Sequence, residues 1–235
     1  MTGSPAFYAR TGTPLGDLIT LLHIPYTIWH LSYVAIGAAL APSVDWLILV
    51  GTVAAFAFGL GVGAHALDEL HDRPLSTGLS ELSLRLLGWG GLAVGGAIAV
   101  VAAFAISPVA LAWGAAGVAL AAAYALEWPH WVHSTLGFGL AWGAFPVLVG
   151  YWGQVGALSP AALTVAAAAT VLSMVQRTLS TPARHLRRDP DAASASTGER
   201  SWDTSDLLET WERPLQLLVV AHVLLAIGLL ARHLT

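Results

Sequence analysis

Long apolar runs separated by short polar connections make up most of this chain of 235 residues. Seven of the runs approach the roughly 20 residues that a helix needs to cross about 30 Å of hydrocarbon. They predict helices over residues 17–40, 46–67, 82–106, 109–126, 132–152, 161–179 and 213–232. Residues 180–212 are polar and predict a cytoplasmic loop. The pattern is typical of an all-α, polytopic membrane helical bundle with a single transmembrane domain over residues 1–235.

Composition supports the membrane interpretation and limits the chemistry. Hydrophobic residues make up 56% of the chain and charged residues 10%, whereas soluble domains carry roughly 25% charged residues. The lipid bilayer is therefore an expected partner, and the net charge of -4 gives no reason to expect a nucleic acid. The chain has no cysteine, so disulfides and thiolate metal sites are excluded and any metal needs nitrogen and oxygen ligands.

The distribution of arginine predicts the orientation. Nine of the ten basic residues, all of them arginine, fall on the same side as the N-terminus, and only Arg232 falls on the other. Short cytoplasmic segments of membrane proteins carry the excess of positive charge. We therefore expect a multi-pass protein of the cell (inner) membrane with a cytoplasmic N-terminus.

An unusual group of ionisable residues ends the second predicted helix, within residues 61–78. On a helix, His65, Asp68 and Glu69 share one face, because residues three and four apart are neighbours. An ionised side chain deep in a bilayer costs roughly 2.5–3.5 kcal/mol, so such groups usually line a cavity, pair or hold a cation. The alternative is that the helix has already reached water, as the nearby Arg73 would also indicate.

Two further groups of polar residues are predicted at the same depth. His23 and His30 lie two helical turns apart on the first helix and so share a face. Glu127, His130 and His133 lie between the fourth and fifth helices, and Glu followed by His three residues later is a ligand spacing of bundle-type di-iron sites. Packing histidines and an interfacial aromatic belt are the alternatives.

Together these groups give a set of imidazoles and carboxylates at one predicted depth. Such a set favours iron, with manganese or zinc as alternatives. The expected metal ligands are His23, His30, His65, Asp68, Glu69, Glu127, His130 and His133. The expected catalytic carboxylates are Asp68, Glu69 and Glu127, and the pattern leaves open whether Asp68 or Glu69 faces the cavity.

Several segments resemble the UbiA-type intramembrane prenyltransferase superfamily. That family carries Asn-Asp-x-x-Asp and then Arg-Pro-Leu-x-x-Gly after its second helix, and residues 65–78 here read HALDELHDRPLSTG. Tyr124 and the Gly-rich residues 137–151 are similar to the segment after the family's fourth helix. The first helix is similar too, with His23 in the position of a family arginine. The resemblance covers roughly residues 18–188 and implies a UbiA-like bundle with a central cavity.

One family motif is replaced. The second Asp-rich motif, expected after the sixth helix, reads RTLSTPARHLRR over residues 177–188, and the nearest acidic residues are Asp189 and Asp191. In the family, two facing Asp motifs hold Mg²⁺ and a diphosphate. The resemblance therefore implies either conversion to a His-rich transition-metal site or a diphosphate site that uses arginine. The arginines expected to bind a phosphate or headgroup are Arg73, Arg184, Arg187 and Arg188.

Three functions remain open from the sequence. The first is a UbiA-like metalloenzyme that acts on a lipophilic isoprenoid or acyl-lipid substrate, with an oxidoreductase favoured for iron and a hydrolase for zinc. The second is a diverged Mg²⁺-dependent prenyltransferase or terpene cyclase that uses a prenyl diphosphate. The third is a non-enzymatic metal or proton transporter or lipid-binding protein, which is disfavoured because the opposite side offers only Asp45 and His222.

Overall fold

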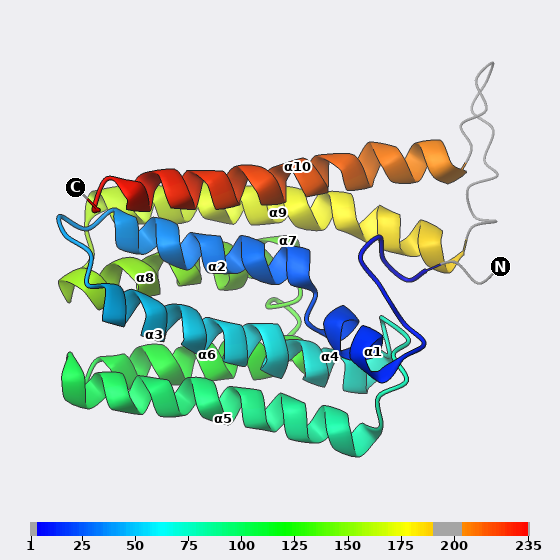
Figure 1. Cartoon of the computed structure of the whole chain (residues 1–235), viewed down its shortest axis with the longest axis horizontal. Helices are drawn as coiled ribbons and strands as arrows, with labels where there is room; N and C mark the ends of the chain where they lie inside the picture. Colours follow the sequence, from blue (N-terminus) through cyan, green and yellow to red (C-terminus); the bar gives the residue numbers. More distant parts are fainter. Residues whose placement is uncertain (1–3, 190–203, 235) are drawn as a thin grey trace.

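The computed structural model describes residues 4–189 and 204–234, and within these ranges every regular element is a helix. Figure 1 shows the helices running side by side along one axis, with the N- and C-termini at opposite ends. The helices are α1 (Pro14–Leu21), α2 (Ile24–Ala39), α3 (Trp46–Phe56), η1 (Ala57–Ala64), α4 (His65–Asp72), α5 (Glu81–Ala105), α6 (Ala110–Ala125), α7 (Thr135–Gly139), η2 (Leu140–Ala144), α8 (Phe145–Val155), α9 (Pro160–Arg188) and α10 (Thr204–Ala231). The segments α3, η1 and α4 form one continuous rod, as do α7, η2 and α8.

Within the described residues, six helical spans are long and apolar enough to cross a membrane, counting α1 and α2 together as one span over Pro14–Ala39. This confirms the predicted polytopic helical bundle. The predicted span 109–126 corresponds to α6, which has only 16 residues. At 1.5 Å per residue it is roughly 24 Å long, short of the hydrocarbon thickness. The cytoplasmic side of the N-terminus and the inner-membrane location stay predictions.

Two predicted boundaries are wrong. The loop expected over 180–212 is largely helical, because α9 continues to Arg188 through Pro182 and α10 begins at Thr204; residues 190–203 lie outside the described residues. The first predicted helix, 17–40, is interrupted between α1 and α2. His23 there has a left-handed backbone with φ 45°, and a proline follows in the first turn of α2, where proline is favoured.

Both π-helical segments are rich in glycine or alanine and pack closely against a neighbouring helix. α5 packs so tightly on η1 that a Cβ on Gly91 would lie 2.6 Å from the Phe58 carbonyl oxygen and 2.7 Å from the Gly63 nitrogen. Such π-helical turns are frequent at functional sites. They place Leu60 of η1 and Trp142 of η2 in the interior of the bundle.

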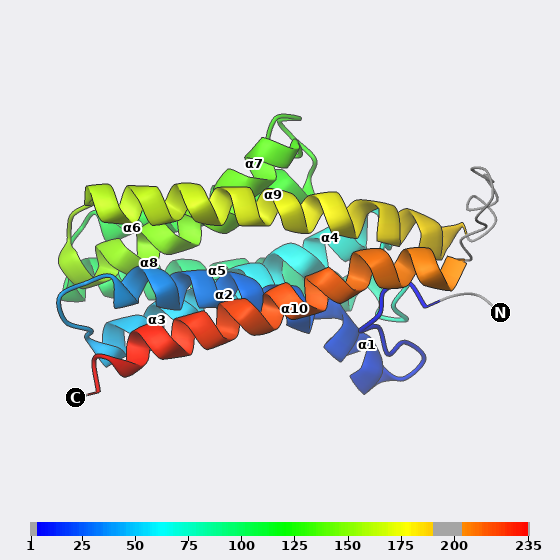
Figure 2. The same ribbon diagram turned by 90° about the horizontal axis from the view of Figure 1, so that it is seen from above.

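The main core surrounds α2, which packs against α8 on one side and α10 on the other. Trp29 and Tyr33 of α2 are 0% and 2% exposed and belong to the largest group of buried apolar residues. Figure 2 shows α2 and α10 side by side, and α7 with its preceding loop projecting from the other face. The Arg-rich end of the bundle, where α9 ends and α10 begins, is the end that holds the N-terminal segment (Figure 1).

Candidate functional site

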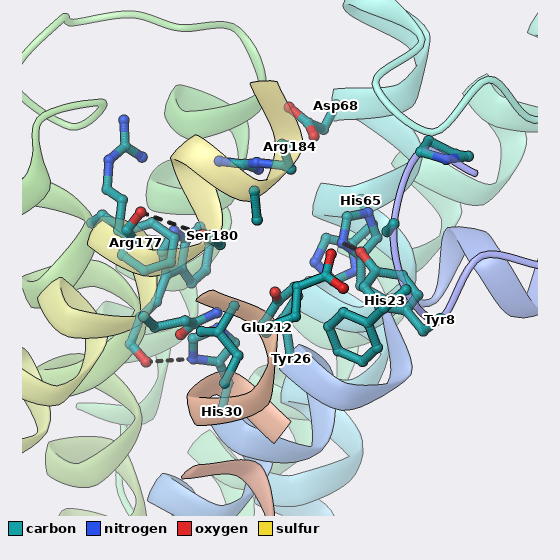
Figure 3. A pocket seen from close by; sticks show the side chains of 18 of the residues that line it. Tyr8, His23, Tyr26, His30, His65, Asp68, Arg177, Ser180, Arg184 and Glu212 are labelled. Carbon is teal, nitrogen blue, oxygen red and sulfur yellow. Dashed lines mark hydrogen bonds between the residues drawn. The ribbon is translucent and has the colours of Figure 1, made fainter. Parts of the chain in front are cut away.

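A small chamber of about 80 Å³ opens near the Arg-rich end, between α2, α4, α9 and α10 (Figure 3). We call it the polar chamber because ionisable, hydroxyl and amide side chains make up much of its wall. These groups are Tyr8, His23, Tyr26, His30, His65, Asp68, Tyr124, Gln176, Arg177, Ser180, Arg184, Arg187 and Glu212. The chamber thus contains four of the eight predicted metal ligands and two of the four predicted phosphate-binding arginines.

His23 and His65 meet in the chamber wall, although 42 positions separate them. Their rings stack with centroids 4.1 Å apart. The Tyr8 hydroxyl lies 2.8 Å from Nδ1 of His23, and Nδ1 of His65 lies 3.2 Å from the Gly61 carbonyl oxygen, which can only accept. The break between α1 and α2 turns His23 toward α4, so the predicted shared depth of these histidines corresponds to a real contact.

Sequence analysis missed the N-terminal segment, which closes one side of the chamber. Residues 5–8 line it, with Phe7 and Tyr8 edge-on to Tyr26 at 6.4 and 5.7 Å between ring centroids. Burial raises the pKa of the Tyr8 hydroxyl well above its usual value, so this hydroxyl stays protonated at neutral pH. The sequence signal for this contact was the pair of aromatic residues, Phe7 and Tyr8, in an otherwise polar N-terminal segment.

Sequence analysis also missed Glu212. Its carboxylate accepts two hydrogen bonds from Arg187, at 2.5 Å from Nε and 2.7 Å from Nη2, and it is only 8% exposed. Arg187 Nη1 also donates to the Ser4 carbonyl oxygen at 3.3 Å. The charge of Arg187 is therefore matched inside the protein. The contact joins α9, α10 and the N-terminal segment.

Arg177 and Arg184 bring two further guanidinium groups to the chamber from α9. Arg177 donates to the His133 carbonyl oxygen at 2.6 Å and to the Tyr124 hydroxyl at 3.2 Å. Arg184 is exposed on one side and lies within electrostatic range of the Asp68 carboxylate. Arg184 is therefore the guanidinium best placed to meet an incoming anion.

The structure distinguishes Asp68 from Glu69. Glu69 is fully buried and accepts hydrogen bonds from the Leu75 amide at 2.8 Å and from the Thr77 amide and hydroxyl at 2.8 and 2.9 Å. Its carboxylate holds the 73–80 connection in place through these hydrogen bonds and does not line the chamber. The predicted roles of Glu69 as a catalytic residue and a metal ligand are therefore inconsistent with its position. Asp68 lines the chamber.

Two of the predicted anion-binding arginines, Arg73 and Arg188, donate hydrogen bonds to the backbone of the 73–80 connection. Arg73 donates to the carbonyl oxygens of Thr77 and Leu79 at 3.3 and 2.7 Å. Arg188 is exposed and donates to the Pro74 carbonyl oxygen at 3.3 Å. Neither lines the polar chamber, which corrects their predicted role. Arg184 and Arg187 do line it.

None of the predicted Glu127, His130 and His133 side chains lines the chamber, although Glu127 and His133 lie within electrostatic range of Asp68. α6 ends at Ala125, and Glu127 and His130 are exposed on the following loop. His133 stacks on Tyr124 at 4.3 Å, with Nε2 3.0 Å from the Tyr124 carbonyl oxygen. Among the described residues, no group of three or more His, Asp or Glu side chains is close enough to hold a metal ion. The eight predicted ligands therefore do not form one centre.

His30 occupies the inner end of the chamber. It is 3% exposed, and its Nδ1 lies 2.8 Å from the Trp142 carbonyl oxygen, which makes Nδ1 the donor. This contact ties α2 to η2. His30 therefore combines a packing role with a place in the chamber wall.

A second, larger cavity lies beside the polar chamber, between α3 with η1, α5, α6 and α8. Its volume is about 350 Å³ and its lining is almost wholly apolar; we call it the apolar cavity. Leu60 and Trp142 line both spaces. Gly51 and Gly59 line it and leave open space where a Cβ would lie. The volume is in the range of small-molecule sites.

Comparison of the chain with protein-family models, with curated proteins and with solved structures gives no match. The fold and the two adjoining spaces define the chain as a polytopic helical membrane protein with an internal site.

Proposed function

We propose that this protein is a UbiA-like membrane enzyme that binds an isoprenoid or acyl lipid with a phosphate or diphosphate head group. The observation that supports this most is the junction at Leu60 and Trp142, where the polar chamber and the apolar cavity share lining residues. An amphiphile needs a charged and an apolar environment side by side.

The head group is assigned to the polar chamber because of its cations. Arg177 and Arg184 face the chamber, and guanidinium groups bind phosphate oxygens with strong, charge-assisted hydrogen bonds. The neighbouring His23 has a buried Nε2 without a hydrogen-bond partner among the described residues, and this Nε2 is a donor in the tautomer whose Nδ1 accepts from the Tyr8 hydroxyl. An anionic head group with several acceptor oxygens matches these donors.

The hydrocarbon chain is assigned to the apolar cavity. Transfer of apolar surface out of water is favourable by about 25 cal/mol per Å². The cavity wall offers Phe56, Trp113 and Phe145 together with small residues of α5 and α6. A linear chain that enters past Leu60 would be surrounded by this wall.

The resemblance to prenyltransferases implies Mg²⁺, and the chamber offers one suitable carboxylate. Mg²⁺ is usually held by one or two carboxylates together with substrate phosphates. Asp68 fits this role, since Glu69 is bound to the 73–80 connection and Glu212 to Arg187. When bound, Mg²⁺ would neutralise charge on the head group. The arginines act at the same place, by stabilising negative charge on a departing diphosphate.

The transition-metal oxidoreductase stays a prediction from the sequence, and the diphosphate proposal has the stronger geometric support. His23, His65 and Asp68 share the chamber with Arg177 and Arg184, while the charge of Arg187 is matched by Glu212. The positive charge of the arginines favours binding of an anionic ligand over binding of a transition-metal cation.

The proposal is tested by comparing three ligands on purified protein with Mg²⁺. Farnesyl diphosphate has both a hydrocarbon chain and a diphosphate head group. Farnesol has only the hydrocarbon chain, and inorganic pyrophosphate has only the head group. We expect farnesyl diphosphate to bind at least about tenfold more tightly than either fragment. Arg184→Ala should weaken both phosphate ligands about tenfold and leave farnesol unchanged.

Arg85→Ala is the matched control, because Arg85 lies at the same end but pairs with Glu81 on the surface. Its affinity for all three ligands should equal that of the wild type. Equal affinity for farnesol and farnesyl diphosphate, or an Arg184→Ala variant with unchanged affinity, would contradict the proposal.

A further inference from the structure

Four polar side chains meet in the hydrophobic core, outside both spaces described above. Trp29 and Tyr33 come from α2, Ser173 from α9 and His222 from α10. They are 0%, 2%, 0% and 4% exposed. We call them the interior polar cluster. Neither the polar chamber nor the apolar cavity includes any of the four.

The members of the cluster contact one another closely. The His222 ring stacks on Trp29 with centroids 4.4 Å apart and meets Tyr33 edge-on at 5.1 Å. The Tyr33 hydroxyl faces the polar atoms of Trp29 and Ser173 and interacts weakly with both, but neither contact has the geometry of a full hydrogen bond. Each of the four nevertheless has a buried polar atom without a hydrogen-bond partner among the described residues: Nε1 of Trp29, the Tyr33 hydroxyl, Oγ of Ser173 and Nε2 of His222.

The hydrogen-bonding capacity of each atom can be assigned. Nδ1 of His222 lies 2.6 Å from the Leu218 carbonyl oxygen, which only accepts, so Nδ1 carries a proton and Nε2 of the neutral ring is an acceptor. The indole Nε1 of Trp29 is only a donor, and the hydroxyls of Tyr33 and Ser173 can donate or accept. The cluster therefore presents donors and an acceptor to one small region.

Leaving these groups unpaired would be costly. Buried polar groups are hydrogen-bonded in the great majority of proteins, and a membrane interior offers no bulk water to pair them. Packing alone would be served better by phenylalanine and leucine. Four such side chains, from three helices, therefore indicate a ligand with both donor and acceptor capacity and a very small volume.

We propose that the interior polar cluster is a binding site for a resident water molecule. Water can accept from the Trp29 indole, donate to Nε2 of His222 and form a third bond with the Tyr33 hydroxyl, which lies beside Ser173. Buried waters typically make about three such bonds to groups that are otherwise unpaired. The site would then connect α2, α9 and α10 by hydrogen bonds across the core.

The position of this water site relates it to the polar chamber. His30 and Gln176 line the inner end of the chamber, and each lies three positions, or about one helical turn, from Tyr33 or Ser173. Gln176 is 3% exposed, and its Oε1 also lacks a partner among the described residues. The resident water therefore lies next to the chamber floor. The inference does not depend on the chamber's ligand.

A crystal structure of the full chain in a lipid phase, at a resolution that shows ordered waters, tests the proposal directly. We expect a water peak at about 2.7–3.2 Å from both Nε1 of Trp29 and Nε2 of His222. A well-defined map in which the four polar atoms bond only to one another, or to nothing, would overturn it.

The sign of a stability change gives a second test. Tyr33→Phe should lower the melting temperature by about 2–4 °C if the hydroxyl binds water, because a water partner is lost. It should raise the melting temperature if the hydroxyl is simply unpaired, and that result would overturn the proposal. Ser32→Ala is the control, since this buried hydroxyl on the same helix donates to the Ile28 carbonyl oxygen and should change the melting temperature little.

Discussion

Two stretches of this chain carry histidine and carboxylate residues at similar spacing, and the fold treats them differently. His65 and Asp68 line the polar chamber, whereas Glu127 and His130 are exposed on the loop after α6. The first stretch faces a chamber whose other walls come from α9, α10 and the N-terminal segment, and the second follows a helix that ends at Ala125. Similar residue types at similar spacing therefore do not by themselves define a site. The helices and segments that enclose the residues decide whether a site forms.

The largest effect is expected from the buried carboxylate next to the chamber. Glu69→Gln replaces an acceptor of three hydrogen bonds with an amide whose NH₂ group faces other donors. We expect the melting temperature to fall by on the order of 5–10 °C, measured by thermal unfolding in mild detergent.

Glu127→Gln is the matched control on the exposed loop. Its melting temperature should stay within about 1 °C of the wild type, because surface substitutions seldom change stability. Equal destabilisation by the two substitutions would mean that the loop carboxylate is as important to the fold as the buried one.

The next effect concerns Mg²⁺. Asp68→Asn should lower the affinity for farnesyl diphosphate in Mg²⁺ by about tenfold and remove most of the dependence on Mg²⁺. Titrations with and without a chelator measure both quantities. If Glu127→Gln reduced the dependence on Mg²⁺ and Asp68→Asn did not, the assignment of the two carboxylates would be reversed.

A smaller effect is expected at the junction of the two spaces. Leu60→Trp adds a large side chain where the chain of the lipid must pass. The affinity for farnesyl diphosphate should fall by roughly three- to tenfold through overpacking, with that for inorganic pyrophosphate unchanged. An equal loss of affinity for farnesyl diphosphate and for inorganic pyrophosphate would contradict the assignment of the chain and the head group to two separate spaces.

The smallest effect is expected at the exposed histidine. His130→Ala should change the affinity for farnesyl diphosphate by less than about twofold, while His23→Ala, which removes the ring held by Tyr8 and His65, should reduce it more. Both are measured in the same binding assay. A larger loss in His130→Ala than in His23→Ala would contradict the comparison.

Periodicity and length predicted the helices well, because a chain in lipid must pair its backbone within helices. The break at His23 was missed, although the proline two residues later was a signal. The continuation of α9 to Arg188 was missed because its last turns are polar. Those turns are helical because α10 packs beside them and Glu212 pairs with Arg187.

The site was predicted in part. The place of His23, His30, His65 and Asp68 in the chamber wall followed from ionisable residues in apolar surroundings. Contributions from distant segments could not be read from local pattern, and so Tyr8 and Glu212 were missed. Glu69 was assigned to the site because its spacing equals that of Asp68, and only the path of the 73–80 connection shows which of the two carboxylates faces the chamber.

The most direct test of the central claim is photo-crosslinking with a farnesyl diphosphate analogue that carries a diazirine near the end of its chain, followed by peptide mass spectrometry. The account predicts labelling of residues that line the apolar cavity, such as Ile98, Val118 and Phe145, and competition by unlabelled farnesyl diphosphate but not by farnesol. Labelling confined to exposed side chains of α10, such as Leu217 and Leu224, without competition, would contradict it.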